Sequence, residues 1–167
     1  AVEFIETEQW FTKVLDKKKK LIEQGNKIKW HPEFMHKRYD NWVRGLEWDW
    51  SISRNRHFGV PIPVWECAEC GEIILPLENE LPIDPIQVKK KCLKCGKDAE
   101  PEKMVLDTWA TSSMTPQIAA GLVSSSHDPF DKSKAPNVSL PFSFRPQAHD
   151  IIRTWAFYTI VKAYLHE

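Results

Sequence analysis

The sequence has no excess of charge of either sign, because 23 Lys and Arg residues balance 23 Asp and Glu residues. Bulk electrostatics therefore gives no reason to expect nucleic acid as a partner, although a local basic patch is compatible with this balance. The sequence also lacks a run of about 18 uncharged apolar residues, which argues against a membrane span. No basic stretch followed by an apolar one opens the chain, so we expect no secretory signal. These absences favour a cytoplasmic protein that does not associate with a membrane.

Aromatic residues are abundant, with 8 Trp and 8 Phe in 167 residues, and the hydrophobic share is 42%. So much apolar surface can offset the entropy of ordering the chain, so we expect an ordinary folded core. The first residue is Ala1 and not an initiator methionine, from which we expect part of a longer protein. The four cysteines form two close pairs, which favours a metal site over disulfides in a chain without a signal.

Apolar spacing predicts two helices in the first third of the chain. The first covers residues 9–24, with Thr7 as N-cap and Gly25 as its stop, and the second covers residues 33–46. We interpret the lysines of residues 17–20 as a solvated helix end, with contact to RNA phosphates as the alternative. Two nearby prolines, Pro61 and Pro63, exclude a helix and indicate an edge strand that leads into the cysteine segment.

In the last third, the residue pattern predicts a strand at residues 104–106 and then a long surface connection at 121–141. A second strand at 142–144 and a buried helix at 151–165 follow, with Asp150 as the N-cap of the helix. This order indicates an α/β fold with a partial Rossmann-type parallel sheet, its helices, and a small zinc-knuckle insert. We expect three segments: 1–64, helical with an edge strand; 65–103, the zinc-knuckle insert; and 104–167, a part of the nucleotide-binding fold.

Both cysteine pairs have two intervening residues and a following glycine, so each can form a tight knuckle around a thiolate. Between the pairs lie 21 residues. Two such knuckles suit a tetrahedral four-thiolate site, which zinc usually occupies. Because sulfur would fill all four positions, the zinc would be structural rather than catalytic. A pair of disulfides or an iron–sulfur cluster is the alternative. The expected ligands are Cys67, Cys70, Cys92 and Cys95.

Four motifs in order resemble class I aminoacyl-tRNA synthetases, and specifically the valyl-tRNA synthetase family. Residues 50–56 with 58–65 resemble the W-x-I-S-R-Q-R-x-x-G-x-x-I-P-x-W stretch of enzymes for aliphatic amino acids, with Asn55 in place of the usual Gln. The cysteine knuckles resemble the zinc insert of these enzymes. Residues 106–113 resemble a D-T-W-x-S-S element, and residues 145–155 resemble one branch of a D-I-x-x-x-W segment.

The resemblance implies an enzyme that activates valine with ATP to valyl-adenylate and then charges tRNA(Val). It also implies which residues take part. Trp109, Ile151 and Trp155 would enclose the valine side chain, and rigid aromatic faces suit a branched isopropyl group. The alternative for both tryptophans is core packing. The ribose of ATP or of the adenylate would lie against Gln147, Ala148, His149 and Asp150.

Two features bear on the assignment of residues 147–150 to ribose binding. Ala148 stands where class I enzymes commonly have Gly, and Asp150 can equally be a plain N-cap. The chain also lacks the family's two ATP signatures, His-x-Gly-His and Lys-Met-Ser-Lys-Ser. We therefore assign no catalytic residue and expect the chain to be inactive alone, because donors around the transferring phosphate are usually a large part of catalysis.

Three rival interpretations remain. The isoleucine enzyme is the nearest, although two tryptophans should leave too small a pocket for isoleucine. A zinc-ribbon module that binds nucleic acid without catalysis would fit the cysteines and the lysine run. A purely structural interaction module would bind no adenylate.

Overall fold

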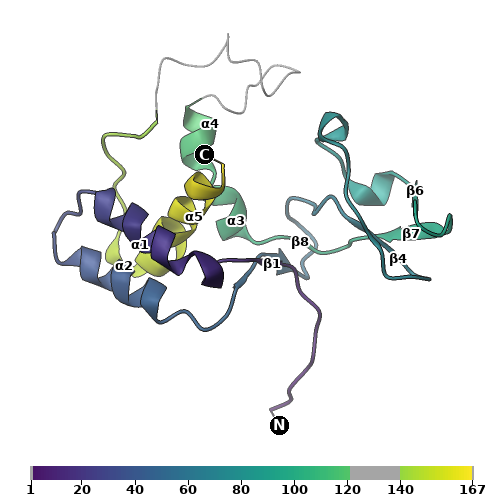
Figure 1. Cartoon of the computed structure of the whole chain (residues 1–167), viewed down its shortest axis with the longest axis horizontal. Coiled ribbons are helices and arrows are strands. Elements are labelled where there is room, and N and C mark those ends of the chain that lie inside the picture. Colours follow the sequence, from purple (N-terminus) through teal and green to yellow (C-terminus); the bar gives the residue numbers. More distant parts are fainter. Residues whose placement is uncertain (1, 121–139, 167) are drawn as a thin grey trace. The chain divides into compact units, whose positions relative to one another are not determined.

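The computed structural model describes residues 2–120 and 140–166, and most of the connection predicted at 121–141 lies outside them. The chain forms two compact units (Figure 1). The first unit comprises residues 1–10 and 51–107, and the second comprises residues 11–50 and 108–167. Each unit is therefore built from two stretches of the chain that lie far apart in the sequence.

The first unit contains a short antiparallel pair, β3 (Ser53–Arg54) with β8 (Val105–Leu106). Pro61 extends this pairing through a bridge to Val105, so the two-proline segment does lie at a strand edge. Gly59 faces the Val105 side chain, and a Cβ at residue 59 would lie 2.5 Å from Val105 Cγ2. Glycine is needed at residue 59 because the backbone passes so close to a branched side chain.

A four-stranded sheet carries the cysteines in the same unit. Its strand order is β5 (Ile73–Ile74), β4 (Trp65–Cys67), β7 (Asp98–Pro101) and β6 (Lys90–Lys91), and each neighbouring pair is antiparallel. Two 3-10 turns, η2 (Glu78–Glu80) and η3 (Pro85–Gln87), lie between β5 and β6. Trp65 is fully buried, and its indole Nε1 donates to the Val88 carbonyl at 2.8 Å. This tryptophan provides the core of a sheet that otherwise has few apolar residues.

The second unit is mainly helical. Its first stretch has β1 (Phe11–Thr12), the 3-10 turn η1 (Leu15–Lys17), α1 (Lys18–Lys27) and α2 (Met35–Arg44). It ends at Trp50, the first residue of β2 (Trp50–Ser51), which pairs with β1. Its second stretch has α3 (Thr108–Ser112) and α4 (Thr115–Ala119). It closes with the 3-10 turn η5 (His149–Ile151), the π-helical turn η6 (Ile152–Ala156) and α5 (Phe157–Leu165).

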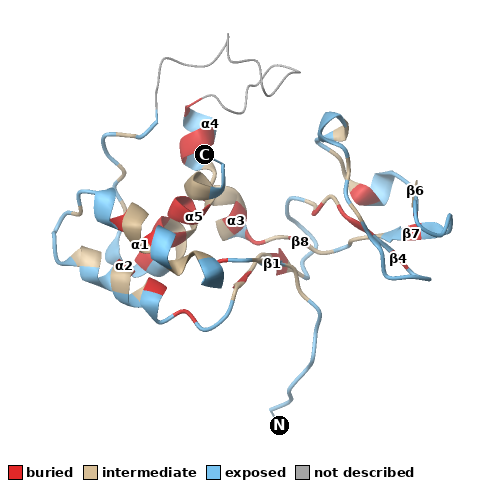
Figure 2. Cartoon of the chain, viewed as in Figure 1, coloured by how far each residue is buried: buried red, intermediate tan, exposed pale blue. Residues whose placement is uncertain are grey.

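The core of the second unit lies where α1, α2 and α5 meet. Figure 2 shows buried residues along α1 and α5, and the buried apolar set includes Leu21, Tyr39, Val43, Phe157 and Val161. The Tyr39 hydroxyl donates to the Leu21 carbonyl at 2.8 Å, which ties α2 to α1. The prediction that the last helix is buried is confirmed, since four residues of α5 are buried.

Several sequence predictions of local structure are wrong. Residues 9–17 are not α-helical: Phe11 and Thr12 form a strand, and α1 begins at Lys18. Thr7 therefore caps no helix, and Gly25 lies inside α1 rather than at its end. Residues 142–144 form no strand, because three alternating residues cannot hold an extended segment without a pairing partner. The last helix begins at His149 with Ala148 as N-cap, so Asp150 is not the cap.

The fold is mixed α/β, and the pairings of β3 with β8 and within the four-stranded sheet are antiparallel. The predicted Rossmann-type parallel sheet is not shown by residues 2–120 and 140–166, whose other sheet is the two-stranded β1–β2 pair. The helix predicted at 33–46 and the strand predicted at 104–106 are confirmed as α2 and β8. In the described part of the chain, no helix has the length and apolar character needed to cross a bilayer.

Candidate functional site

The four cysteine sulfurs of the first unit converge on one point. Their Sγ atoms lie within 4.8 Å of one another, and all four thiols are free. The Sγ of Cys67 lies 3.4 Å from that of Cys95, and the Sγ of Cys70 lies 3.6 Å from that of Cys92. A tetrahedral ion bound about 2.3 Å from each sulfur would hold the sulfurs about 3.8 Å apart. The cluster therefore has the dimensions of a four-thiolate metal site.

The two knuckles have the same backbone geometry. Gly71 donates to the Cys67 carbonyl and Gly96 donates to the Cys92 carbonyl, each at 2.8 Å. Both glycines have positive φ angles, 66° and 74°, which L side chains rarely adopt. The glycine after each C-x-x-C pair is thus required by the turn, as the sequence pattern predicted.

Neighbouring thiols separate the pKa values of Cys67 and Cys95, because one thiolate opposes the ionisation of the next. The backbone N–H of Cys70 lowers the pKa of Cys67 to about 7, against the opposing effect of burial. Cys95 behaves in the opposite way: despite a hydrogen bond from the Lys97 backbone, its thiol neighbours raise its pKa to about 12. A divalent cation would remove this conflict, since it favours the thiolate form of every ligand.

Trp109, Ile151 and Trp155 all lie in the second unit, and all three are half-buried. The Trp155 indole Nε1 donates to the Ser112 carbonyl at the end of α3, at 3.1 Å. Trp109 lies three residues before Ser112 on that short helix. Ile151 lies about one helical turn before Trp155. The structure thus brings the end of α3 to the turn that carries Trp155.

Trp155 lies within the π-helical turn η6. Such turns are rare and occur frequently at functional sites. A second contact holds the ring: the guanidinium of Arg145 lies over it, 4.0 Å from the ring centroid. The sequence motif included Arg145 without giving it a role, and only the folded structure shows this contact.

The predicted ribose segment begins this same helical region. Ala148, His149 and Asp150 are exposed, so a ligand can reach them. Gln147 is half-buried, and its side-chain oxygen is buried without a hydrogen-bond partner. The His149 carbonyl accepts a hydrogen bond from Arg38 at 3.4 Å. The first turn of the helix is a 3-10 turn whose N-cap side chain accepts no hydrogen bond.

Two of the motifs meet in the first unit, a relationship that the sequence did not indicate. Arg54, from residues 50–56, is ion-paired with Asp107, from residues 106–113. The Asp107 backbone N–H also donates to the Ile52 carbonyl at 2.7 Å. This ion pair fixes the chain directly before α3, which carries Trp109.

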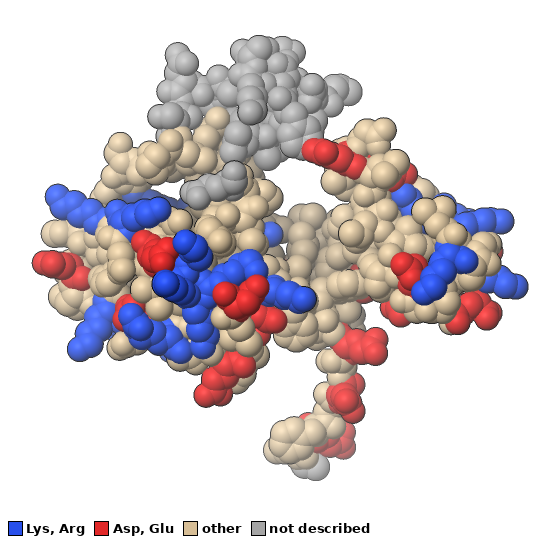
Figure 3. All heavy atoms as spheres, in the orientation of Figure 1, with Lys and Arg blue, Asp and Glu red and all other residues tan. Residues whose placement is uncertain are grey.

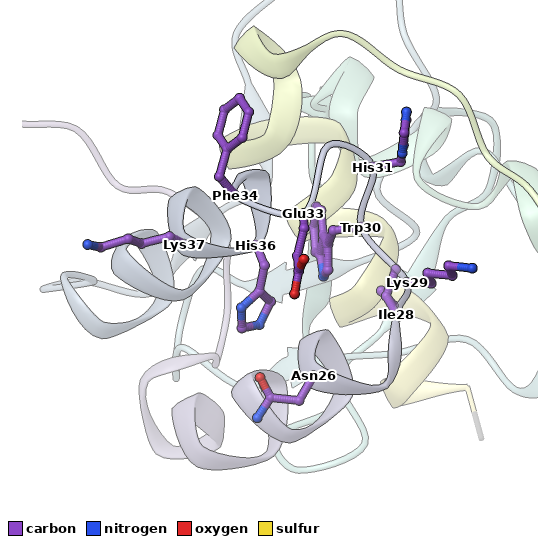
Figure 4. A pocket seen from close by; sticks show the side chains of 9 residues that line it. All are labelled: Asn26, Ile28, Lys29, Trp30, His31, Glu33, Phe34, His36 and Lys37. Atoms are coloured by element: carbon purple, nitrogen blue, oxygen red, sulfur yellow. The ribbon is translucent and has the colours of Figure 1, made fainter.

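An open hollow of about 820 Å³ lies elsewhere in the second unit, between the end of α1 and the start of α2. Asn26, Glu33 and His36 project toward its centre, whereas Lys29 and Lys37 project away (Figure 4). A smaller hollow of about 260 Å³ in the first unit is lined by Trp10, Trp65 and neighbouring residues. Neither hollow is lined by a predicted site residue.

The lysine run at residues 17–20 is largely engaged within the second unit. Lys17 pairs with Asp16, and Lys20 pairs with Glu23. Lys18 donates to the carbonyls of Arg44 and Leu46 near the end of α2. Figure 3 shows basic and acidic side chains interspersed over the helical unit. These contacts favour the interpretation of the run as a solvated helix end.

Residues 2–165 match the family model described as tRNA synthetases class I (I, L, M and V). The chain therefore belongs to the class I tRNA synthetases, as its motifs predicted. Three curated relatives are each named valine--tRNA ligase. The Thermoplasma acidophilum protein is 51% identical over 98% of this chain and 20% of its own length. The Methanocaldococcus jannaschii protein is 48% identical over 97% of this chain and 18% of its own length. The Rickettsia conorii protein is 44% identical over 99% of this chain and 20% of its own length.

The chain thus spans about a fifth of the length of these relatives. Among solved structures, it resembles the crystal structure of the ternary complex of Agrobacterium radiobacter K84 agnB2 LeuRS-tRNA-LeuAMS, with a TM-score of 0.50 and 27% identity. That match covers 71% of this chain and 17% of the other. It agrees with the family assignment.

Proposed function

We propose that this chain is the part of a valine--tRNA ligase that recognises the valine side chain and the ribose of the adenylate. In the whole enzyme, a valine carboxylate oxygen would bond to the α-phosphorus of ATP and release pyrophosphate. The resulting valyl-adenylate would then pass its valyl group to tRNA(Val) and release AMP. The chain would bind valine and the adenylate. The complete enzyme would provide the parallel nucleotide-binding sheet of which this chain forms a part.

The observation that carries this proposal is the hydrogen bond from Trp155 to the end of α3. It joins the two elements that bear the proposed walls of the valine pocket, Trp109 and Trp155, and Ile151 lies about a turn away from Trp155. Two indoles and one branched aliphatic side chain suit an isopropyl group and would exclude longer side chains by size. The names of relatives at 43–51% identity support valine as the amino acid.

The ribose would lie against residues 147–150. The ribose would first meet the exposed residues 148–150, and the Gln147 side chain, whose oxygen is buried without a partner, would have to turn outward to accept a hydrogen bond from a hydroxyl. A ribose hydroxyl would satisfy this buried polar group. We assign positioning of the sugar, not chemistry, to this segment.

We propose zinc as the ion held by Cys67, Cys70, Cys92 and Cys95. Four thiolates in a tetrahedral arrangement with knuckle turns are its usual structural site. Held by four sulfurs, the ion would stabilise the four-stranded sheet, which has few apolar residues of its own. It would supply no chemistry to aminoacylation.

The test uses a complete valine--tRNA ligase that carries this sequence, with Trp155→Ala as the variant and Trp48→Ala as its control. Trp48 is 69% exposed and belongs to no predicted site. We expect W155A to lower kcat/KM for valine in pyrophosphate exchange about 10- to 200-fold, which is the usual effect of a changed apolar pocket. W48A should change it less than about twofold. Equal kcat/KM in the two variants, or a loss of thermal stability in W155A that accounts for its lost activity, would refute the pocket.

A further inference from the structure

Arg145 lies in the irregular segment that precedes η5 and contacts Trp155 and Thr115 among the residues that the structure describes. Its guanidinium carbon lies 4.0 Å from the centroid of the Trp155 ring. Its Nη2 donates to the Thr115 hydroxyl, at the start of α4, at 3.1 Å. Its Nε is buried without a hydrogen-bond partner. Among the described residues, the guanidinium is therefore held by the indole face and by one hydroxyl.

This stack is closer than the other cation–ring contacts of the unit. Arg153 lies 5.8 Å from the Trp42 ring centroid, and Lys162 lies 5.9 Å from that of Trp50. At 4.0 Å, a planar guanidinium is in van der Waals contact with the indole, a geometry that an ammonium group does not reproduce. Burial lowers the pKa of Arg145, because desolvation disfavours its charged form.

Two contacts on different parts of the ring leave the Trp155 indole little freedom. The hydrogen bond to the Ser112 carbonyl holds its Nε1 edge, and Arg145 covers one of its faces. The Nε1 edge and the face beneath Arg145 are therefore closed to a ligand, so that a ligand could contact only the opposite face or the remaining edge. A pocket wall that is fixed before binding loses less entropy when the ligand arrives.

We propose that Arg145 is a positioning residue of the valine pocket: it fixes the Trp155 ring so that the face opposite the guanidinium forms the pocket wall. This inference rests on the proposed function of Trp155. Arg145 acts through the indole and through its link to α4. It contributes to the fit of valine without touching it, and thereby to the choice among small amino acids.

The experiment compares Arg145→Met with Arg145→Lys in a complete ligase that carries this sequence. R145M keeps the length of the side chain but removes the planar cation, and R145K restores the charge without the stack. We expect R145M to raise KM for valine about 3- to 30-fold, the range of an aromatic–cation contact that is largely desolvated. KM for ATP should change less than about twofold, and R145K should recover only part of the loss.

Arg153→Met is the matched control, because it removes the longer contact with Trp42 and should leave KM for valine unchanged. Thr115→Val is a milder second variant: it removes only the acceptor of Arg145 Nη2 and should raise KM for valine in the same direction. It keeps the proposal testable if R145M does not fold.

The double variant R145M/W155A separates positioning from general destabilisation. If Arg145 acts through Trp155, R145M has little further effect on KM for valine once the indole is gone. An equal effect of R145M with and without Trp155, or parallel increases of KM for valine and ATP, would overturn the positioning role. The two proposals fail differently. If W155A leaves kcat/KM for valine unchanged, the pocket itself is refuted. If W155A lowers kcat/KM for valine but R145M and T115V leave KM for valine unchanged, only the role of Arg145 is refuted.

Discussion

The guanidinium of Arg54 donates a hydrogen bond to the carboxylate of Asp107, although the two residues are 53 positions apart in the sequence. The Asp107 side chain is only 7% exposed and that of Arg54 is 38% exposed. Arg54 also donates to the Ser53 carbonyl at 2.6 Å and to the Ser51 carbonyl at 3.2 Å. The guanidinium thus satisfies backbone groups of its own strand while it binds the carboxylate that precedes α3.

We expect Asp107→Asn to lower the free energy of unfolding of the chain by about 1–3 kcal/mol, because the substitution leaves a partly buried cation without its counter-charge. Glu72→Gln is the matched control. Glu72 pairs with Lys94, but their side chains are 45% and 66% exposed, so its loss should cost less than about 0.5 kcal/mol. Urea unfolding of both variants measures the difference. Similar midpoints for D107N and E72Q would contradict a structural role for the buried pair.

We expect the protein, purified without chelators, to contain about one zinc ion per chain, and Cys70→Ser to abolish or greatly weaken binding. Elemental analysis measures the content. Glu69→Gln is the control, because it changes the same knuckle without removing a ligand. Chelation should increase amide exchange in the four-stranded sheet and leave α1 and α2 protected, since those helices belong to the other unit. Metal-free wild-type protein, or full metal content in C70S, would contradict the site.

The parts of the structure that follow from local rules could be predicted from the sequence. The cysteine cluster is one, because its two knuckles are short turns and the spacing and glycines of Cys67–Gly71 and Cys92–Gly96 already specify them. The helix α2 is another, since its apolar residues recur at helical spacing over ten residues. The buried last helix also follows from its composition.

The sequence predictions that are wrong concern residues whose partners lie far away in the sequence. Residues 9–17 have helical spacing, yet Phe11 and Thr12 pair with β2, and Asp49 binds the chain at Val14. Gly25 has the appearance of a helix stop, but the Tyr39 ring needs the space beside it. Arg145 lies over the ring of Trp155, which belongs to a π-helical turn, and no pattern in the sequence specifies either feature.

Gly25→Ala should destabilise the chain by about 1–3 kcal/mol, the usual cost of overpacking a core. A Cβ at residue 25 would overlap the Tyr39 ring, which is fully buried and hydrogen-bonded to α1 through its hydroxyl. The clash should outweigh the gain in helix propensity from alanine, which is at most about 1 kcal/mol. Asn26→Ala, at the next and exposed position of α1, is the control and should be neutral or slightly stabilising. Thermal or urea unfolding of the two variants decides the matter, and a stabilised G25A would show that the ring can move aside.

The carboxylate of Asp49 binds the backbone at the start of η1, although the two lie at opposite ends of residues 11–50. Asp49 accepts hydrogen bonds from the backbone N–H groups of Val14 at 2.8 Å and Leu15 at 3.0 Å. These bonds, that of Val14 first, lower the pKa of Asp49 below its ordinary value of 3.8. Because the pKa is lower in the folded state, the carboxylate stabilises the fold above pH 3.8. That stabilisation disappears as the pH falls through the lowered pKa of the folded state.

We therefore expect Asp49→Asn to be less stable than the wild type at neutral pH, since an amide oxygen accepts these bonds without a negative charge. The difference between the two proteins should shrink as the pH falls below 3.8, where the wild type also loses its carboxylate. Urea midpoints between neutral pH and about pH 2.5 measure this difference. Glu47→Gln, at an exposed position two residues earlier, controls for the loss of a surface charge. A difference between D49N and wild type that stays constant across this range would mean that the charge of Asp49 does not stabilise the start of η1.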